Sequence, residues 1–203
     1  MFLKKKIILL IFFSLSLILL FFYNNHNKKS HTQIGGNFQL TNHLGQKTTN
    51  DSFNGYYRLV FFGFTNCPDF CPDTLNNIGA IIDKIDKKNE LIPIFITVDP
   101  ERDTAPKLKE YLLNFHPKII ALTGTKEQIE NVKKKYRIFS KKIMDMKKEN
   151  DESNHNHNSH DHGGYSVDHT TIIYLMDKKG NYITHLNPDT TNTGAIKKIN
   201  QYL

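Results

Sequence analysis

The sequence predicts an α/β protein in which helices cover both faces of a mixed β-sheet. Apolar runs of strand length alternate with amphipathic helical segments through residues 59–136. Two further strand-like segments, joined by a tight turn, and a final helix follow near the C-terminus. The only two cysteines of the chain stand where the first core strand turns into a helix. An apolar segment near the N-terminus is expected to form a single transmembrane helix ahead of this domain.

The first half of the domain is predicted to contain a small hairpin followed by strand, helix and strand. Residues 38–40 and 47–49 flank a turn-forming Asn-His-Leu-Gly segment, which indicates the hairpin. Residues 59–64 and 91–98 are continuous apolar runs, as expected of strands that are buried on both faces. Between them, residues 73–87 place one apolar face toward the core at helical spacing, made of Leu75, Ile78, Ile81, Ile82 and Ile85.

The second half continues the alternation. A helix is predicted after Asp103 or Thr104, because either side chain can cap it and Pro106 then falls in the first turn. The remaining elements are a strand at 119–122, a helix at 126–136, a hairpin of strands 170–176 and 181–186, and a closing helix at 193–202. This order, with the cysteines after the first core strand, predicts a thioredoxin-like fold.

Composition divides the chain into three regions. Residues 1–23 join a basic start to a 17-residue apolar run, which spans roughly 25 Å at about 1.5 Å per residue. Residues 24–36 form a polar tether, and residues 37–203 suffice for one domain with its own core. Three lysines before the run favour a cytoplasmic N-terminus, and no small-x-small cleavage site follows it. We therefore expect an uncleaved single-pass anchor in the inner membrane with the domain facing the periplasm; a cleaved signal peptide is the alternative.

The basic charge is concentrated at the start of the chain. Lysines before residue 30, with no acidic residue among them, supply five of the seven net positive charges. The remaining charge of +2 does not indicate a nucleic-acid partner.

The two cysteines, Cys67 and Cys71, are separated by three residues and can meet on one face of a helical turn. A helix N-terminus lowers the pKa of a thiol and so favours the thiolate, which binds soft metals and attacks disulfides. The spacing is one residue longer than the usual Cys-x-x-Cys redox motif. A metal site, a redox pair and a structural disulfide all remain open on this pattern alone.

Residues 149–164 contain no apolar side chain and are predicted to form a loop. Four histidines in this loop form a possible weak accessory site for Cu(II), Ni(II) or Zn(II): His155, His157, His160 and His162. The alternative is a solvated insertion without a specific role.

His169 leads into the apolar strand 170–176, whose start faces the cysteines in a thioredoxin-like fold. Two thiolates and one imidazole suit Cu(I), because soft sulfur and imidazole select this ion. Asp168 is a candidate for orienting the imidazole from outside the ligand set. The alternative for a lone histidine is a strand-end residue with no ligand role.

Three motifs resemble the Sco/SenC family of copper-delivery proteins for cytochrome c oxidase, over residues 38–203. They are Gly-Phe-Thr-Asn-Cys-Pro-Asp-Phe-Cys-Pro at 63–72, Thr-Val-Asp-Pro-Glu-Arg-Asp-Thr at 97–104 and Val-Asp-His-Thr at 167–170. The resemblance implies that Cys67, Cys71 and His169 bind copper. It also places the second motif beside the site, where we expect helix capping and local ion pairing from Asp99, Arg102 and Asp103. The histidine-rich insertion departs from the family pattern.

The function predicted from these features is that of a membrane-anchored copper chaperone and not of an enzyme. It would carry Cu(I), and also Cu(II), to the dinuclear centre in the copper-binding subunit of cytochrome c oxidase, with no small-molecule substrate. The alternative is a thiol-disulfide oxidoreductase that reduces the copper-binding cysteines of that subunit. A peroxidase shares the fold, but the sequence lacks the expected Pro-Thr-Cys arrangement.

Overall fold

The structure is a computed structural model of the 203-residue chain. It describes residues 34–144, 165–187 and 190–203, together with Ser16 and Ile18. Contacts divide the chain into two units, Met1–Gln33 and Ile34–Leu203. Apart from Ser16 and Ile18, the predicted transmembrane segment lies outside the described residues. None of the helices that the structure describes has the length and apolar character needed to cross a membrane.

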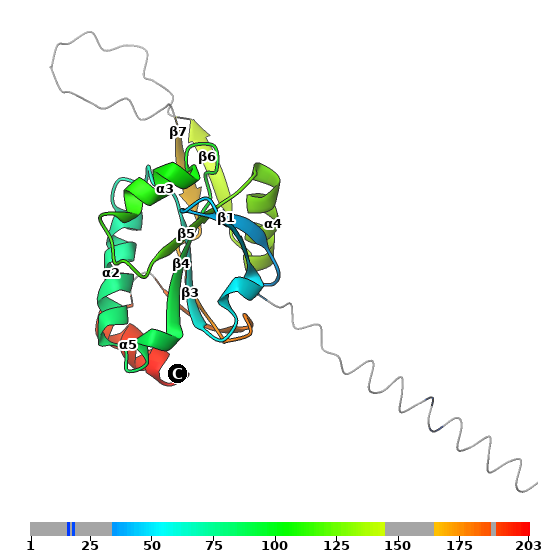
Figure 1. The fold of residues 1–203 in the computed structure, drawn as a ribbon, viewed down its shortest axis with the longest axis vertical. Helices are drawn as coiled ribbons and strands as arrows, with labels where there is room; N and C mark the ends of the chain where they lie inside the picture. Colours follow the sequence, from blue (N-terminus) through cyan, green and yellow to red (C-terminus); the bar gives the residue numbers. More distant parts are fainter. Residues whose placement is uncertain (1–15, 17, 19–33, 145–164, 188–189) are drawn as a thin grey trace, which may run out of the picture. The chain divides into compact units, whose positions relative to one another are not determined.

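The second unit is built on a seven-stranded mixed sheet with the order β2-β1-β5-β4-β3-β8-β9 (Figure 1). The central strands β3, β4 and β5 are parallel, and the outer strands pair antiparallel. The strands are β1 (Gln39–Asn42), β2 (Lys47–Thr49), β3 (Tyr57–Gly63), β4 (Leu91–Thr97), β5 (Ile120–Thr123), β8 (Ile173–Met176) and β9 (Tyr182–Leu186). The mixed sheet predicted from the sequence is therefore confirmed.

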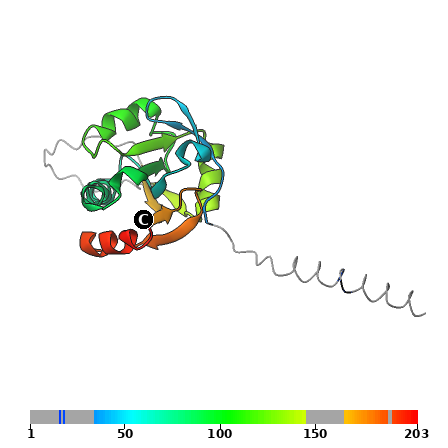
Figure 2. The same cartoon turned by 60° about the horizontal axis from the view of Figure 1, so that its bottom comes forward.

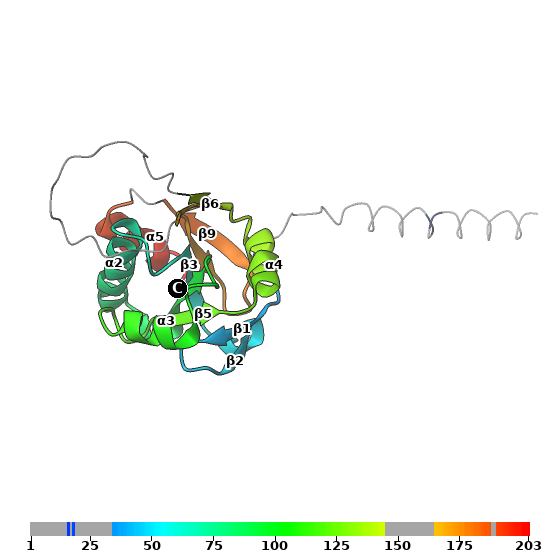
Figure 3. The same cartoon turned by 90° about the horizontal axis from the view of Figure 1, so that it is seen from above.

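Helices cover both faces of this sheet. Helices α2 (Phe70–Lys84) and α5 (Asn192–Asn200) lie together on one face, and α4 (Lys126–Tyr136) lies on the other (Figures 1 and 3). Helix α3 (Ala105–Leu112) packs against β5. Two short 3-10 helices, η1 (Asn50–Phe53) and η2 (Lys88–Glu90), precede β3 and β4. The view in Figure 2 shows the strands enclosed between the helical layers.

The core lies on both sides of β3 and β4. Phe61 and Phe62 are neighbours in β3 and point to opposite faces, yet both are fully buried, as is Phe95 in β4. This is why the two strands are continuous apolar runs in the sequence. The register places Phe61 beside Phe95 and ends with Gly63 beside Thr97, at the edge of the sheet where the cysteine motif begins.

A second sheet of two strands, β6 (Ser140–Met144) and β7 (Tyr165–His169), stands apart from the main sheet. The strands are antiparallel, with Ser140 opposite His169 and Met144 opposite Tyr165. Residues 145–164, which include the histidine-rich segment 149–164, connect them and lie outside the described part of the chain. This hairpin, which the sequence analysis missed, carries His169 as its last residue.

Most predicted elements are found with shifted ends. Helix α4 coincides with the predicted 126–136. Helix α2 begins at Phe70, three residues before its predicted start, so only Cys71 lies in the helix and Cys67 lies in the preceding turn. Thr104, and not Asp103, caps α3 by accepting a hydrogen bond from the Lys107 amide. The prediction that His169 begins the next strand was wrong, because it ends β7 and the strand β8 starts only at Ile173.

Gly63 allows helix α2 to approach the end of β3 closely. A Cβ atom added to Gly63 would lie 2.7 Å from the Cys71 sulfur and 2.7 Å from a ring carbon of Phe95. These distances are below any normal van der Waals contact, and both neighbours are fully buried. The Cys71 sulfur therefore occupies the space that a larger residue would take.

We predict that Gly63→Ala lowers the free energy of unfolding by about 1–3 kcal/mol, because the new methyl group overpacks the core at Cys71 and Phe95. Denaturant unfolding of the purified protein measures this change. The matched control is Gly194→Ala in α5, where the nearest atom to the new Cβ lies 3.2 Å away and alanine is a better helix former than glycine. Equal stability of the two variants would contradict the prediction.

Candidate metal centre

The loop that carries Cys67 is held by a buried carboxylate, Asp103. Its two oxygens accept hydrogen bonds from the amide and hydroxyl of Thr65, at 3.1 and 2.6 Å, and from the hydroxyl of Thr97, at 2.6 Å. Burial raises the pKa of Asp103, and the hydrogen bonds from Thr65 and Thr97 oppose that shift. Asp103 thus joins the turn before Cys67 to the end of β4.

The two cysteines are free thiols with very different surroundings. Cys71 is fully buried, and Cys67 is half-buried. The Cys67 sulfur accepts a hydrogen bond from the Cys71 amide at 3.4 Å. A hydrogen bond from the Cys71 thiol is the main cause that lowers the pKa of Cys67 to about 6, with help from the amides of Cys71 and Asp69. The same hydrogen bond and burial raise the pKa of Cys71. Cys67 is therefore the thiolate of the pair at neutral pH.

The imidazole of His169 meets the cysteines from the end of β7. Its Nε2 lies 3.7 Å from the Cys71 sulfur, and its Nδ1 lies 2.9 Å from the carbonyl oxygen of Thr170. Since a carbonyl only accepts, a neutral imidazole carries its proton on Nδ1 and turns the lone pair of Nε2 toward the sulfur. The ring is enclosed by Phe64 and Phe61, with centroids at 5.7 and 6.4 Å. The orientation suits Nε2 as a metal ligand.

Asp168 does not contact this imidazole. It is exposed, and because side chains alternate along a strand it lies on the opposite face of β7 from His169. The orienting contact predicted from Asp168 is made instead by the Thr170 carbonyl, which bonds Nδ1 of the His169 imidazole. The four loop histidines His155, His157, His160 and His162 lie outside the described residues, and their accessory role stays a prediction.

The structure thus brings His169 to the two cysteines Cys67 and Cys71, although 98 residues separate Cys71 from His169 in the sequence. The contacts join them in pairs, and within the described ranges no group of three or more His, Cys, Asp or Glu side chains is placed so that it could hold a metal ion. Two sulfurs and one imidazole nitrogen form a soft donor set that fits Cu(I).

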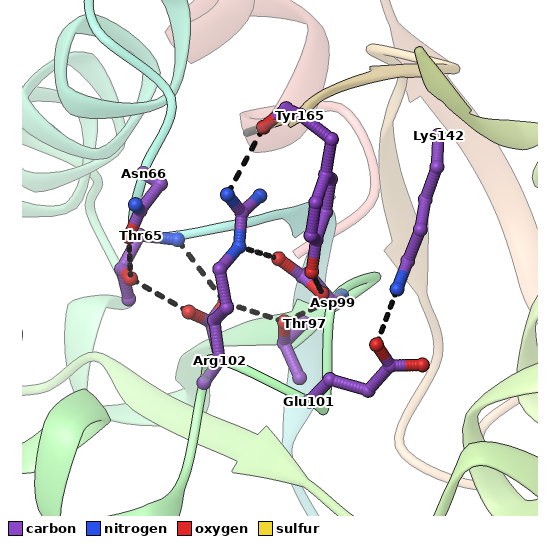
Figure 4. A network of polar contacts seen from close by, with 9 residues as sticks. Thr65, Asn66, Thr97, Asp99, Glu101, Arg102, Lys142 and Tyr165 are labelled. Atoms are coloured by element: carbon purple, nitrogen blue, oxygen red, sulfur yellow. Dashed lines mark hydrogen bonds and ion pairs between the residues drawn. The ribbon is translucent and has the colours of Figure 1, made fainter. Parts of the chain in front are cut away.

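A polar network beside this centre links the second sequence motif to β7 (Figure 4). Asp99 is fully buried and pairs with the guanidinium of Arg102, and it also accepts a hydrogen bond from the Tyr165 hydroxyl at 2.8 Å. Arg102 donates to the Tyr165 carbonyl at 3.0 Å. The local ion pairing expected for Asp99 and Arg102 is present, but Tyr165 was not predicted because it is distant in sequence from its partners.

A cleft of about 440 Å³ opens beside Cys67. One wall is the cysteine loop from Thr65 to Pro68, and the other is formed by residues of α3 and the turn after it, including Lys107 and Tyr111. The cleft leaves Cys67 open to an incoming group, while Cys71 stays covered.

We predict that iodoacetamide alkylates Cys67 far faster than Cys71 at neutral pH, and that the rate for Cys67 falls as the pH drops through about 6, because only the thiolate reacts. Mass spectrometry of the labelled protein gives the rate at each cysteine. The control is Cys71→Ala, which removes the thiol that donates a hydrogen bond to Cys67. It should move the pH midpoint of Cys67 alkylation toward the pKa of an ordinary thiol. An unchanged midpoint in that variant would show that another group lowers the pKa.

Comparison with known proteins agrees with the sequence motifs. A family model described as SCO1/SenC matches residues 26–203. The SCO2-like protein of Rickettsia prowazekii is 42% identical over 158 residues, which cover 77% of this chain and 71% of that protein. The mitochondrial SCO1 homolog 1 of Arabidopsis thaliana is 38% identical over 175 residues, which cover 83% of this chain and 48% of that protein.

Solved structures give the same assignment. ScoI of Bradyrhizobium japonicum with copper bound has a TM-score of 0.69 at 37% identity, covering 84% of this chain and 99% of that chain. Yeast Sco1 with copper bound has a TM-score of 0.69 at 35% identity, covering 83% of this chain and 87% of that chain. BsSco shares the fold at 22% identity with a TM-score of 0.59, covering 83% of this chain and 92% of that chain. It is a member of the Sco family of cytochrome c oxidase assembly proteins in which a disulfide switch was identified. The chain belongs to the SCO1/SenC family.

Proposed function

We propose that this protein is a membrane-anchored copper chaperone that delivers copper to the dinuclear copper centre of cytochrome c oxidase. The observation that carries the proposal is the convergence of two cysteines and His169, with Nε2 3.7 Å from the Cys71 sulfur. Relatives with copper bound, at 37% and 35% identity, support copper as the cargo. The donor set favours Cu(I), and we propose Cu(II) as a second state that the imidazole helps to retain.

The unequal burial of the two cysteines suggests how copper would leave. A partner's ligand has to reach the metal from the open side, and Cys67 borders the cleft whereas Cys71 is fully buried. We therefore propose that Cys67 is the first ligand exchanged for a donor from the copper-binding subunit of the oxidase. Such exchange needs no small-molecule substrate and no catalytic turnover.

We further propose that residues 1–23 anchor the protein in the inner membrane by one span, with residues 24–36 as a tether and the domain of residues 37–203 in the periplasm. The support is the sequence pattern of three lysines followed by an apolar run that is broken only by Ser14 and Ser16. This arrangement would hold the copper centre near a membrane-embedded partner.

A second candidate function is reduction of a disulfide in the oxidase subunit, favoured by the low pKa of Cys67 beside the open cleft. The Cys67 thiolate would attack the partner disulfide, form a mixed disulfide and release one partner thiolate. Cys71 would then lose its proton and attack the Cys67 sulfur, which forms the Cys67–Cys71 disulfide and releases the second partner thiol. Two electrons pass from the cysteine pair to the partner.

His169 separates these two functions, because thiol exchange needs both sulfurs but no imidazole. We predict that His169→Ala weakens copper binding at least about tenfold, or 1.4 kcal/mol, and lowers oxidase assembly, which excess copper partly restores. The Cys67–Cys71 pair should still oxidise and reduce reversibly. Copper affinity by competition with a chelator, and oxidase activity in cells, measure the two effects.

The matched control is His185→Ala, which removes a histidine of β9 whose ring bonds the Tyr182 hydroxyl. It should change neither copper affinity nor assembly. If His169→Ala assembles the oxidase normally while Cys67→Ser or Cys71→Ser fails, reduction of the partner's thiols is the better explanation. Tight Cu(I) binding without both cysteines would refute the proposed ligand set.

The anchor has its own test. A reporter that is active only after export, fused after Leu203, should be active, and the protein should stay with the membrane after a high-salt wash. The hydrophobic segment accounts for both results, since salt removes only electrostatically bound proteins. Recovery of a soluble form that begins near residue 25–30 would show cleavage instead of anchoring.

A further inference from the structure

We infer that Asp99, Arg102 and Tyr165 form a clamp that positions His169 and thereby sets how long copper is retained. The inference rests on the proposed function, because it treats His169 as a ligand. The clamp residues themselves do not touch the metal ligands in any contact described above. They act through the strand β7, which begins at Tyr165 and ends at His169.

The β6–β7 hairpin needs such a clamp because it is not part of the main sheet. An isolated two-stranded sheet is marginally stable in water, so its position depends on contacts with the rest of the domain. Side chains alternate along β7, which places Tyr165, Val167 and His169 on one face. Val167 is buried, while Ser166 and Asp168 on the other face are exposed. The clamp and the ligand therefore share the face that packs on the domain.

The clamp holds both the side chain and the backbone of Tyr165. The phenol donates to one oxygen of Asp99 at 2.8 Å, and Arg102 pairs with the other oxygen. The Arg102 guanidinium also donates to the Tyr165 carbonyl at 3.0 Å and stacks 3.7 Å from the centroid of its ring. Since Asp99 is fully buried, these charge-assisted contacts act with little competition from water.

The second strand of the hairpin is tied to the same point. Lys142 of β6 lies 4.4 Å from the centroid of the Tyr165 ring and pairs with Glu101, which neighbours Arg102. Figure 4 shows the ring of Tyr165 between Arg102 and Lys142. Arg102 and Lys142 thus both contact the Tyr165 ring, and each is paired with a carboxylate. Together they hold the end of the hairpin that lies away from His169.

The network continues to the cysteine loop. The Asp99 amide donates to the Thr97 hydroxyl at 2.9 Å, and that hydroxyl donates to Asp103, which also holds Thr65. The connection between β4 and α3 therefore fixes both segments that carry candidate ligands: the turn with Cys67 and the strand with His169. Loosening the clamp would let the imidazole leave the sulfurs without unfolding the core.

The experiment uses the purified full-length protein in detergent, loaded with one Cu(I) per chain, and measures the rate of copper transfer to a chelator. Tyr165→Phe removes only the hydroxyl bonded to Asp99. We expect copper release to become about tenfold faster, the size of effect of one hydrogen bond to a charged group, with the unfolding midpoint near that of the wild type. The matched control, Tyr182→Phe, removes the hydroxyl bonded to His185 at 2.6 Å and should leave release unchanged.

A double-mutant cycle distinguishes positioning from a structural role. In a His169→Ala background, Tyr165→Phe should have no further effect on copper release, because the clamp acts only through that imidazole. Lys142→Met gives a second test on the other strand and should also accelerate release. Its control is Lys178→Met, because Lys178 likewise pairs with a glutamate, Glu90, and lies 5.3 Å from the ring of Tyr57.

The outcomes are separable. Two results would overturn the clamp alone. One is a wild-type rate of copper release in both Tyr165→Phe and Lys142→Met. The other is an undiminished effect of Tyr165→Phe in the His169→Ala background. An unchanged release rate in His169→Ala itself would overturn the proposed ligand set, and the clamp with it.

Discussion

Full burial of two carboxylates, Asp99 and Asp103, constrains both segments that carry the candidate ligands. A buried carboxylate has to be compensated by donors, and its removal from water is otherwise costly. The donors come from Thr65 in the cysteine turn, from Thr97 in β4, and from Arg102 and Tyr165. The need to satisfy these oxygens therefore determines where the cysteine turn and β7 lie. A separate, steric constraint places helix α2: Gly63 has no side chain, so Cys71 packs directly on β3.

The asymmetry of the cysteines follows from this packing. Cys71 is buried against the end of β3 and is kept protonated, while it donates a hydrogen bond that stabilises the thiolate of Cys67. A thiolate in an open position and a protonated thiol in a closed one can serve either copper exchange or disulfide exchange. The sulfurs alone do not decide between them. The imidazole of His169 has a use only in the first, which is why the position of β7 is the informative feature of the site.

The sequence predicts elements well where one physical signal dominates. Helix 126–136 has a capping box and a clear apolar face, and it is found at the predicted residues. The β6–β7 hairpin was missed because Ser-Lys-Lys-Ile-Met has little alternation and its partner strand follows a long polar insertion. Arg58 precedes the apolar run predicted at 59–64, yet it belongs to β3 and is fully buried with Asn50 and Asn54 as partners. Such partners depend on the folded structure, as do the contacts of Tyr165 with Asp99 and Arg102.

Under the proposed function the protein has to hold copper and also release it, and the architecture separates these demands. Cys67 lies in the connection between β3 and α2, and Cys71 lies in the first turn of α2. Both pack in or against the main core and cannot move without disturbing it. His169 belongs to a two-stranded hairpin outside the main sheet, held at its far end by polar contacts. Moving that hairpin breaks a few hydrogen bonds and exposes one buried valine, whereas moving the cysteines opens the core. In the proposed function, His169 is therefore the ligand whose contribution can change during delivery at a modest cost in free energy, and the polar contacts at Tyr165 determine how large that cost is.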